Sequence, residues 1–241
     1  MNNPASALTA IEPLRASDYP ASRSDISKVP EQAVYQTVYS ADYYTETDYL
    51  PTADSMLQNT ADAAPVLPEQ LPQAADGQIN WLHFVGINDG DLLKAALSPY
   101  HIHELVLEDI LSRKQRPKIE DYDSYLFIAA RVYQYIDSKL QADQVYLIVG
   151  SNFVLTFQQR PLGLFSKIRA HMRDPRYAVR SQDAAFLAYR IIDRLIDDYF
   201  LTLDQYNNRV ELIDKILFAD TGTNSDLLGR IHRLKRDGVR L

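Results

Sequence analysis

The chain has 241 residues, enough for one large or two small domains. It contains no cysteine, which excludes disulfides, thiolate metal sites and thiol chemistry. No apolar run is long enough to predict a transmembrane helix. The net charge of −7 comes from residues 1–80, where three bases face eleven acids, whereas the rest of the chain is nearly neutral. Nucleic-acid binders usually present a basic face, so this distribution argues against that class.

The N-terminal third has an uneven composition. Residues 1–32 are rich in Pro, Ser and Ala, which predicts a disordered or loosely attached segment without a signal peptide. Residues 33–50 are rich in Val and Tyr, which indicates one or two short strands. Their acidic, Tyr-rich patch fits either a cation or partner site or, more simply, an edge strand with a solvated outer face. A Pro-rich link is expected at about 60–77.

From residue 78 strands and helices alternate, and we expect an α/β domain over 33–180 with a mixed sheet. The predicted strands are Ile79–Val85, Tyr125–Tyr135, and a hairpin of Val145–Val149 and Phe153–Gln158. The predicted helices are Asp91–Leu97, His103–Lys114 and Leu162–Met172.

The segment 105–122 groups charges around one helix end. Glu108 and Asp109 form an acid pair, and a basic cluster follows at Arg113, Lys114, Arg116 and Lys118. Pro117 lies inside this cluster and requires the helix to end before it. The grouped carboxylates fit a cation site. They also fit a solvated helix end, with an i,i+4 ion pair between Asp109 and Arg113.

Residues 181–241 predict a long helical hairpin. No Gly or Pro interrupts 182–218, and apolar residues recur there at steps of three and four, which indicates one long helix. After a turn, Ser225 is a plausible N-cap for a second, basic helix. That helix has no recognisable end before Leu241, so we expect a fragment of a longer protein.

The long helix carries Asp193, Asp197, Asp198 and Asp204 among arginines. An i,i+4 pair between Arg194 and Asp198 predicts a salt-bridged outer face, and a role in binding a divalent cation is the alternative. The five histidines lack the i,i+4 spacing of a metal pair, and His101 and His103 are expected to be surface or capping residues. Phosphate loops and nucleophile elbows are missing from the sequence, so we do not expect an enzyme.

Several of these segments together resemble one family. They are VLEDI at 106–110, QRPKIE at 115–120, YLFI at 125–128, IDRLIDDYF at 192–200 and HRLKR at 232–236. In order and spacing, residues 79–241 resemble the cytoplasmic part of CorA-type magnesium transport proteins.

The resemblance implies an α/β/α layered domain with a mixed sheet, followed by long antiparallel helices. It implies a homopentameric Mg²⁺ channel, also passing Co²⁺ or Ni²⁺, whose cytoplasmic domains bind divalent ions between protomers and keep the pore closed. The implied metal ligands are Glu108, Asp109, Asp193 and Asp197. This part would lie on the cytoplasmic face of the inner membrane, attached through a segment absent from this chain.

The family's stalk acid and its Gly-Met-Asn pore tripeptide have no counterpart in the chain, which therefore would carry sensing but not conduction. Two alternatives remain open. One is the cytoplasmic domain of a zinc-transporting relative with the same fold. The other is a soluble scaffold without a role in transport.

Overall fold

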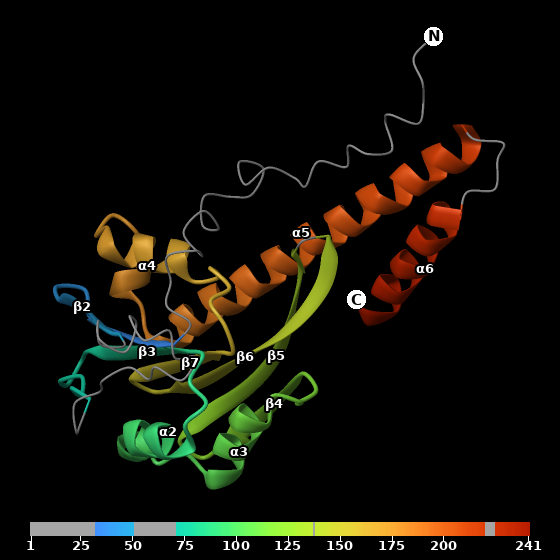
Figure 1. Ribbon diagram of the computed structural model, residues 1–241. Coiled ribbons are helices and arrows are strands. Elements are labelled where there is room, and N and C mark those ends of the chain that lie inside the picture. The colour runs from blue at the N-terminus through green and yellow to red at the C-terminus, as the bar shows by residue number, and fades with distance from the viewer. Residues whose placement is uncertain (1–31, 51–70, 137, 220–224) are drawn as a thin grey trace. The chain divides into compact units, whose positions relative to one another are not determined.

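The computed structural model describes residues 32–50, 71–136, 138–219 and 225–241 (Figure 1). These residues form two compact units. The sheet unit comprises the described residues up to Arg131 together with Asp143–Arg194. The helix unit comprises Val132–Ala142 and Leu195–Leu241. Strands β5 and β6 and helix α5 each continue from one unit into the other.

A seven-stranded sheet has the order β2-β1-β3-β7-β6-β5-β4. Strands β3 and β7 run parallel, whereas the β1–β2, β1–β3, β4–β5 and β6–β7 pairs run antiparallel, so the sheet is mixed as predicted. The strands are β1 Ala33–Tyr39, β2 Tyr44–Tyr49, β3 Ile79–Val85, β4 Lys118–Tyr122, β5 Tyr125–Ile136, β6 Lys139–Gly150 and β7 Phe153–Gln158.

One face of the sheet is covered by α2 (Gly90–Leu97) and α3 (Glu104–Ser112) (Figure 1). Leu82 and Phe84 of β3 point into the core on this side, where they belong to one buried cluster with the apolar residues of both helices. From α3 this cluster receives Val106, Leu107 and Ile110. Burying each such side chain contributes about 1.5–3 kcal/mol, which fixes the face that α3 turns to solvent.

The alternate residues of β3 point to the opposite face, because successive side chains of a strand alternate. Thr156 Oγ1 accepts a hydrogen bond from Trp81 Nε1 at 3.1 Å and lies 2.8 Å from His83 Nδ1. The ring of Phe165 packs edge-on against His83 at 4.9 Å between centroids. On this side of the sheet lie α4 (Ser166–Arg173) and the first turns of α5 (Ala184–Ala219) (Figure 1).

The predicted strands are all present, and β1 and β2 form the two short strands expected in 33–50. Strand β2 lies at one edge of the sheet and is mostly exposed or half-buried, as the edge-strand interpretation predicted. Strand β4 was missed, because its sequence KIEDY is dominated by charge. It is the other edge strand, where charged side chains prevent pairing with a further strand.

Three predicted boundaries were wrong. Helix α3 ends at Ser112 rather than Lys114, because Arg113 adopts a left-handed conformation (φ 55°) that stops the helix. Helix α4 begins only at Ser166, after Gly163 with φ 67°. Strand β6 begins at Lys139, six residues earlier than predicted, because its first half is polar and hides the alternation.

The helix unit contains the rest of α5 and helix α6 (Ser225–Arg240), which run antiparallel as predicted (Figure 1). Tyrosine hydroxyls hold the end of α6. Tyr135 donates to Asp237 at 3.1 Å, and Tyr199 donates to the carbonyl of Leu241 at 2.8 Å. Helix α5 extends over 36 residues and is close to its predicted bounds.

Some predictions fall outside the described residues. They are the loose segment 1–32 apart from its last residue, most of the Pro-rich link at 60–77, and the capping role of the Ser225 side chain.

Candidate functional site

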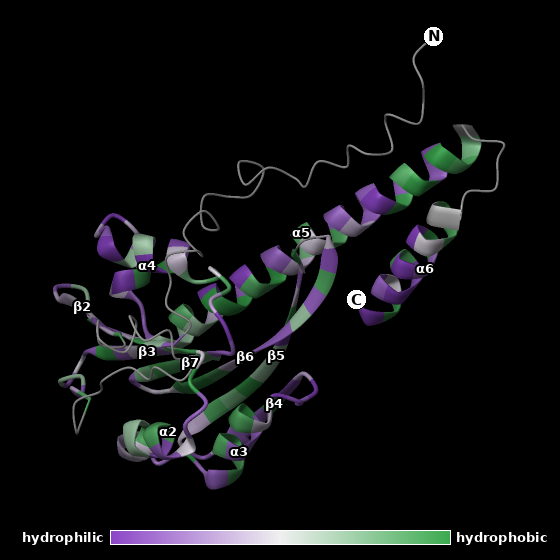
Figure 2. Cartoon of the chain, in the orientation of Figure 1, coloured by the Kyte–Doolittle hydropathy of each residue, from purple (hydrophilic) through white to green (hydrophobic). Residues whose placement is uncertain are grey.

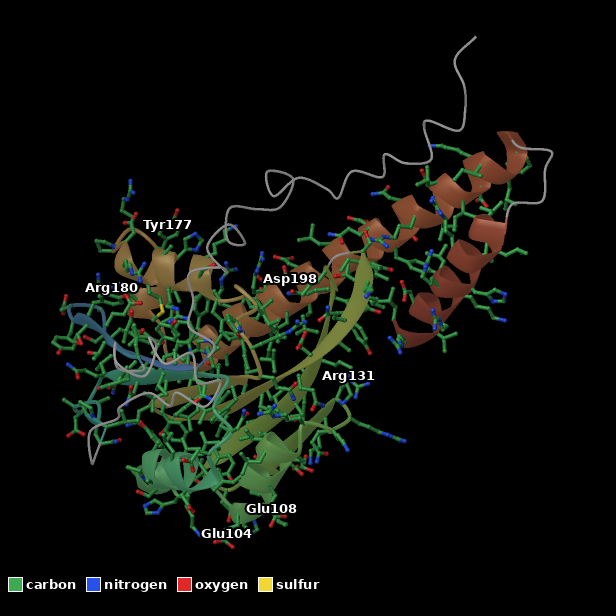
Figure 3. The ribbon with its side chains drawn as sticks, viewed as in Figure 1. Glu104, Glu108, Arg131, Tyr177, Arg180 and Asp198 are labelled. Atoms are coloured by element: carbon green, nitrogen blue, oxygen red, sulfur yellow. The ribbon has the colours of Figure 1, made fainter. Side chains whose placement is uncertain are left out.

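Helix α3 presents the first predicted acid pair. Its N-cap is His103, whose Nδ1 accepts a hydrogen bond from the backbone N–H of Leu105 at 3.2 Å, which confirms the capping role predicted for this histidine. With the apolar face of α3 in the core, Glu108 is exposed and points away from the sheet (Figure 3). Asp109 is half-buried at the start of the last turn.

The ion partner of Asp109 is Lys118, not Arg113 as the helical spacing predicted. Lys118 Nζ lies 2.7 Å from Asp109 Oδ2 and 2.8 Å from Glu120 Oε1. Because its ammonium donates to both carboxylates, the pKa of Lys118 is raised above its usual value. The left-handed conformation of Arg113 ends the helix before the i,i+4 pair can form, and Pro117 leads the chain into β4, which brings Lys118 back.

The loop between α3 and β4 is fixed through Gln115. Its backbone N–H donates to Gln144 Oε1 at 3.2 Å, and its carbonyl accepts from Arg131 Nη2 at 3.2 Å and from Gln144 Nε2. Its side-chain amide donates to Asp109 Oδ1. Of the four bases predicted around this helix end, Lys118 alone turns toward the acids, whereas Arg113, Lys114 and Arg116 are exposed.

Sequence reasoning missed the positioning roles of Gln115, Glu120, Arg131 and Gln144. Gln144 is 29 residues from Gln115 and Arg131 is 16 residues away, and no helical spacing links them. In a strand, Lys118 and Glu120 lie on the same side, and this spacing could have indicated that they act together. Because β4 was not predicted, the spacing was not used.

The second acid set lies on α5. Asp193 is half-buried and accepts from Arg190 Nη1 at 3.0 Å, whereas Asp197 is exposed. The salt-bridged face expected for Arg194 and Asp198 does not face outward, because Arg194 is 9% exposed and Asp198 is 1% exposed. Figure 3 labels Asp198 along α5. Asp197 is therefore more accessible to a cation than Asp193 or Asp198.

Within the sheet unit the two acid sets are not brought together. Glu108 and Asp109 lie on α3, and Asp193 lies on the part of α5 that covers the opposite face of the sheet (Figure 1). Among the described residues no group of three or more His, Cys, Asp or Glu side chains has the arrangement of a metal site. Each acid set can therefore supply at most one or two carboxylates to a cation.

Comparison with known proteins gives concordant results. The family model described as CorA-like Mg²⁺ transporter protein matches residues 76–241. The cobalt/magnesium transport protein CorA of Thermotoga maritima is 31% identical over 214 residues, which span 88% of this chain and 59% of that protein. The chain thus spans less than two thirds of the length of this relative.

Two solved structures share the fold. The soluble domain of CorA from Methanocaldococcus jannaschii superposes with a TM-score of 0.61 at 15% identity, over 86% of this chain and 72% of that one. The cytoplasmic domain of ZntB from Vibrio parahaemolyticus gives a TM-score of 0.52 at 14% identity, over 83% of this chain and 74% of that one. In the described part of this chain, no helix is both long and apolar enough to span a membrane.

Proposed function

Because the chain belongs to the CorA-like Mg²⁺ transporter family, we propose that it is the cytoplasmic, divalent-cation-sensing part of a CorA-type channel. In this proposal Mg²⁺ binds between the protomers of a homopentamer and stabilises the closed assembly, and Co²⁺ or Ni²⁺ can take its place. The chain spans 59% of its Thermotoga maritima relative, and in this proposal the membrane-spanning part belongs to the remainder. The observation that carries the proposal is the acid pair on the packed helix α3, in which Glu108 is exposed and Asp109 is half-buried beside it.

Magnesium suits these ligands. It prefers oxygen donors and keeps several of its waters, so one or two carboxylates from each protomer are enough for a weak site. The ligand set consists of carboxylates alone, and the chain has no cysteine, which favours Mg²⁺ over the softer Zn²⁺. For this reason we rank a zinc-transporting relative as the second candidate function.

The positions of the acids support a site shared between chains. Glu108 and Asp109 lie on the opposite face of the sheet from Asp193, so a cation contacting both α3 and α5 needs residues from two protomers. Carboxylates facing one another across such an interface repel when the site is empty. A hydrated Mg²⁺ offsets that repulsion, and it shifts the equilibrium by its difference in affinity for the two states.

Limited proteolysis of the full-length transporter tests the proposal. Mg²⁺ should slow cleavage of the wild type, and Asp109→Lys should abolish this protection because a cation replaces a ligand. The matched control is Glu104→Lys, which makes the same charge change on an exposed residue of the same helix. Protection that persists in Asp109→Lys, or that disappears equally in Glu104→Lys, would remove Asp109 from the sensor.

A further inference from the structure

A groove in the helix unit is lined almost entirely by cationic and aliphatic side chains. It lies between Ser138 with the first residues of β6, the second half of α5 and helix α6, and its volume is about 670 Å³. This volume is in the range of sites that hold small organic ligands. The predicted metal ligands are not among its lining residues.

The lining of the groove is strongly basic. It contains a single carboxylate, Asp237, which already accepts a hydrogen bond from Tyr135. Against it stand six cations, namely Lys139, Arg209, Arg230, Arg233, Arg236 and Arg240. Six positive charges around one groove repel one another unless an anion or solvent offsets the repulsion. The groove therefore favours an anionic ligand.

Three of these arginines are available to a ligand. Arg233, Arg236 and Arg240 are exposed and, within the described residues, form no ion pair. Their spacing of three and four residues places them along one side of α6. The hydrogen bonds from Tyr135 and Tyr199 hold that end of the helix, so the row of guanidinium groups is held in place before a ligand binds.

A fourth arginine is fixed at the other wall of the groove. Arg209 Nη1 donates to the carbonyl of Ser138 at 3.0 Å, and its guanidinium lies 3.8 Å from the centroid of the Tyr135 ring. Arginine at several positions around a groove suits phosphate, whose oxygens accept two parallel hydrogen bonds from one guanidinium.

The floor of the groove is aliphatic. It is formed by Leu140, Leu212, Ile213, Ile216 and Leu234. None of the described residues lining it is aromatic, so the groove offers no ring on which a nucleotide base could stack. Figure 2 shows α6 as mostly hydrophilic, and its Val239 is an apolar side chain that is 82% exposed beside these bases. A ligand with an anionic head and an aliphatic body matches both the rim and the floor.

We propose that this groove binds an anionic phospholipid, with the arginines of α6 on its phosphate headgroup and the aliphatic floor against the start of an acyl chain. Basic helices with apolar side chains bind anionic membrane surfaces in this way. The choice of a lipid over a free phosphate rests on the proposed function, since it requires a chain that works beside a membrane.

Vesicle flotation of the 241-residue chain tests the proposal, in EDTA and at about 0.1 M salt. The chain should float with vesicles of phosphatidylglycerol and phosphatidylcholine but not with phosphatidylcholine alone. Arg233→Glu/Arg236→Glu should lower the bound fraction about tenfold or more. The control Lys114→Glu/Arg116→Glu makes the same charge change on exposed residues of the sheet unit and should bind like the wild type. Circular dichroism and thermal unfolding verify that both variants are folded.

Three results would overturn the proposal: equal flotation with neutral vesicles, equal loss in the control variant, or release of the chain by inorganic phosphate at the same phosphate concentration as the lipid. The last result would assign the groove to a soluble anion. Because EDTA removes divalent cations, the flotation assay is independent of the magnesium-protection experiment. A negative result in either assay therefore does not contradict the proposal tested by the other.

Discussion

Lys118 Nζ lies 2.7 Å from Asp109 Oδ2 and thereby neutralises one of the two carboxylates that α3 offers to a cation. A divalent ion that binds Asp109 directly must compete with this ammonium group. The affinity of the proposed sensor is therefore set by an intramolecular ion pair as well as by the acids themselves, and the pair is partly exposed, so its strength is moderate.

Replacing Lys118 by methionine is expected to make the sensor more sensitive. Loss of the competing ammonium should lower the Mg²⁺ concentration for half-maximal protease protection about two- to fivefold. Lys114→Met removes the same charge from an exposed residue of the loop and should change this concentration little. If both variants shift the titration equally, only the net charge matters and the pairing with Asp109 does not.

The two acids of α5 are expected to contribute unequally. Asp193 is already neutralised by Arg190 at 3.0 Å, whereas Asp197 is exposed. In the same proteolysis titration, Asp197→Asn should therefore raise the Mg²⁺ requirement more than Asp193→Asn. The exposed acid Asp204 provides the control, and Asp204→Asn should have no effect. The reverse order for the first two variants would contradict this ranking.

Acid should destabilise the sheet unit through His83. Burial lowers the pKa of His83 well below its usual value of 6.5, so the folded chain stays unprotonated where the unfolded chain takes up a proton. The contribution of neutral His83 to the free energy of unfolding is therefore complete above about pH 6.5. It is lost as the pH falls, by at most about 1.4 kcal/mol per pH unit.

Urea unfolding between pH 7 and about pH 5 measures this effect. The slope should flatten in His83→Gln and persist in His232→Gln, which changes an exposed histidine. A slope that is unchanged in His83→Gln would assign the acid sensitivity to other groups.

The two glycines of α6 should respond differently to alanine. A Cβ at Gly229 would meet no atom within 4 Å, so Gly229→Ala should stabilise α6 by about 1 kcal/mol through helix propensity. A Cβ at Gly238 would lie 2.4 Å from the Tyr206 hydroxyl oxygen. In Gly238→Ala this clash should cancel the stabilisation that helix propensity provides. Amide hydrogen exchange in α6 distinguishes the two variants, and equal protection would show that Tyr206 moves aside freely.

The local pattern was sufficient for most of the regular elements, although it missed β4. The alternation in β3 and the uninterrupted period of three and four residues in α5 predicted their type and nearly their bounds, because burial of one face leaves its period in the sequence. The acid pair Glu108 and Asp109 was also evident from the sequence as a candidate. Its metal-binding role remains a prediction, as does that of Asp193 and Asp197.

The partners of these residues required the tertiary structure. Lys118 reaches Asp109 because a left-handed residue ends α3 and a charged edge strand returns the chain, and Gln144 fixes the connecting loop from 29 residues away. The basic groove likewise combines residues at the start of β6 with α5 and α6, and 71 residues separate Ser138 from Arg209. The sequence alone determined the buried apolar faces, although not the burial of Arg194 and Asp198, because apolar burial follows the local period. Only the tertiary structure decided which charges meet, because ion pairs and grooves depend on distances between segments that no local pattern encodes.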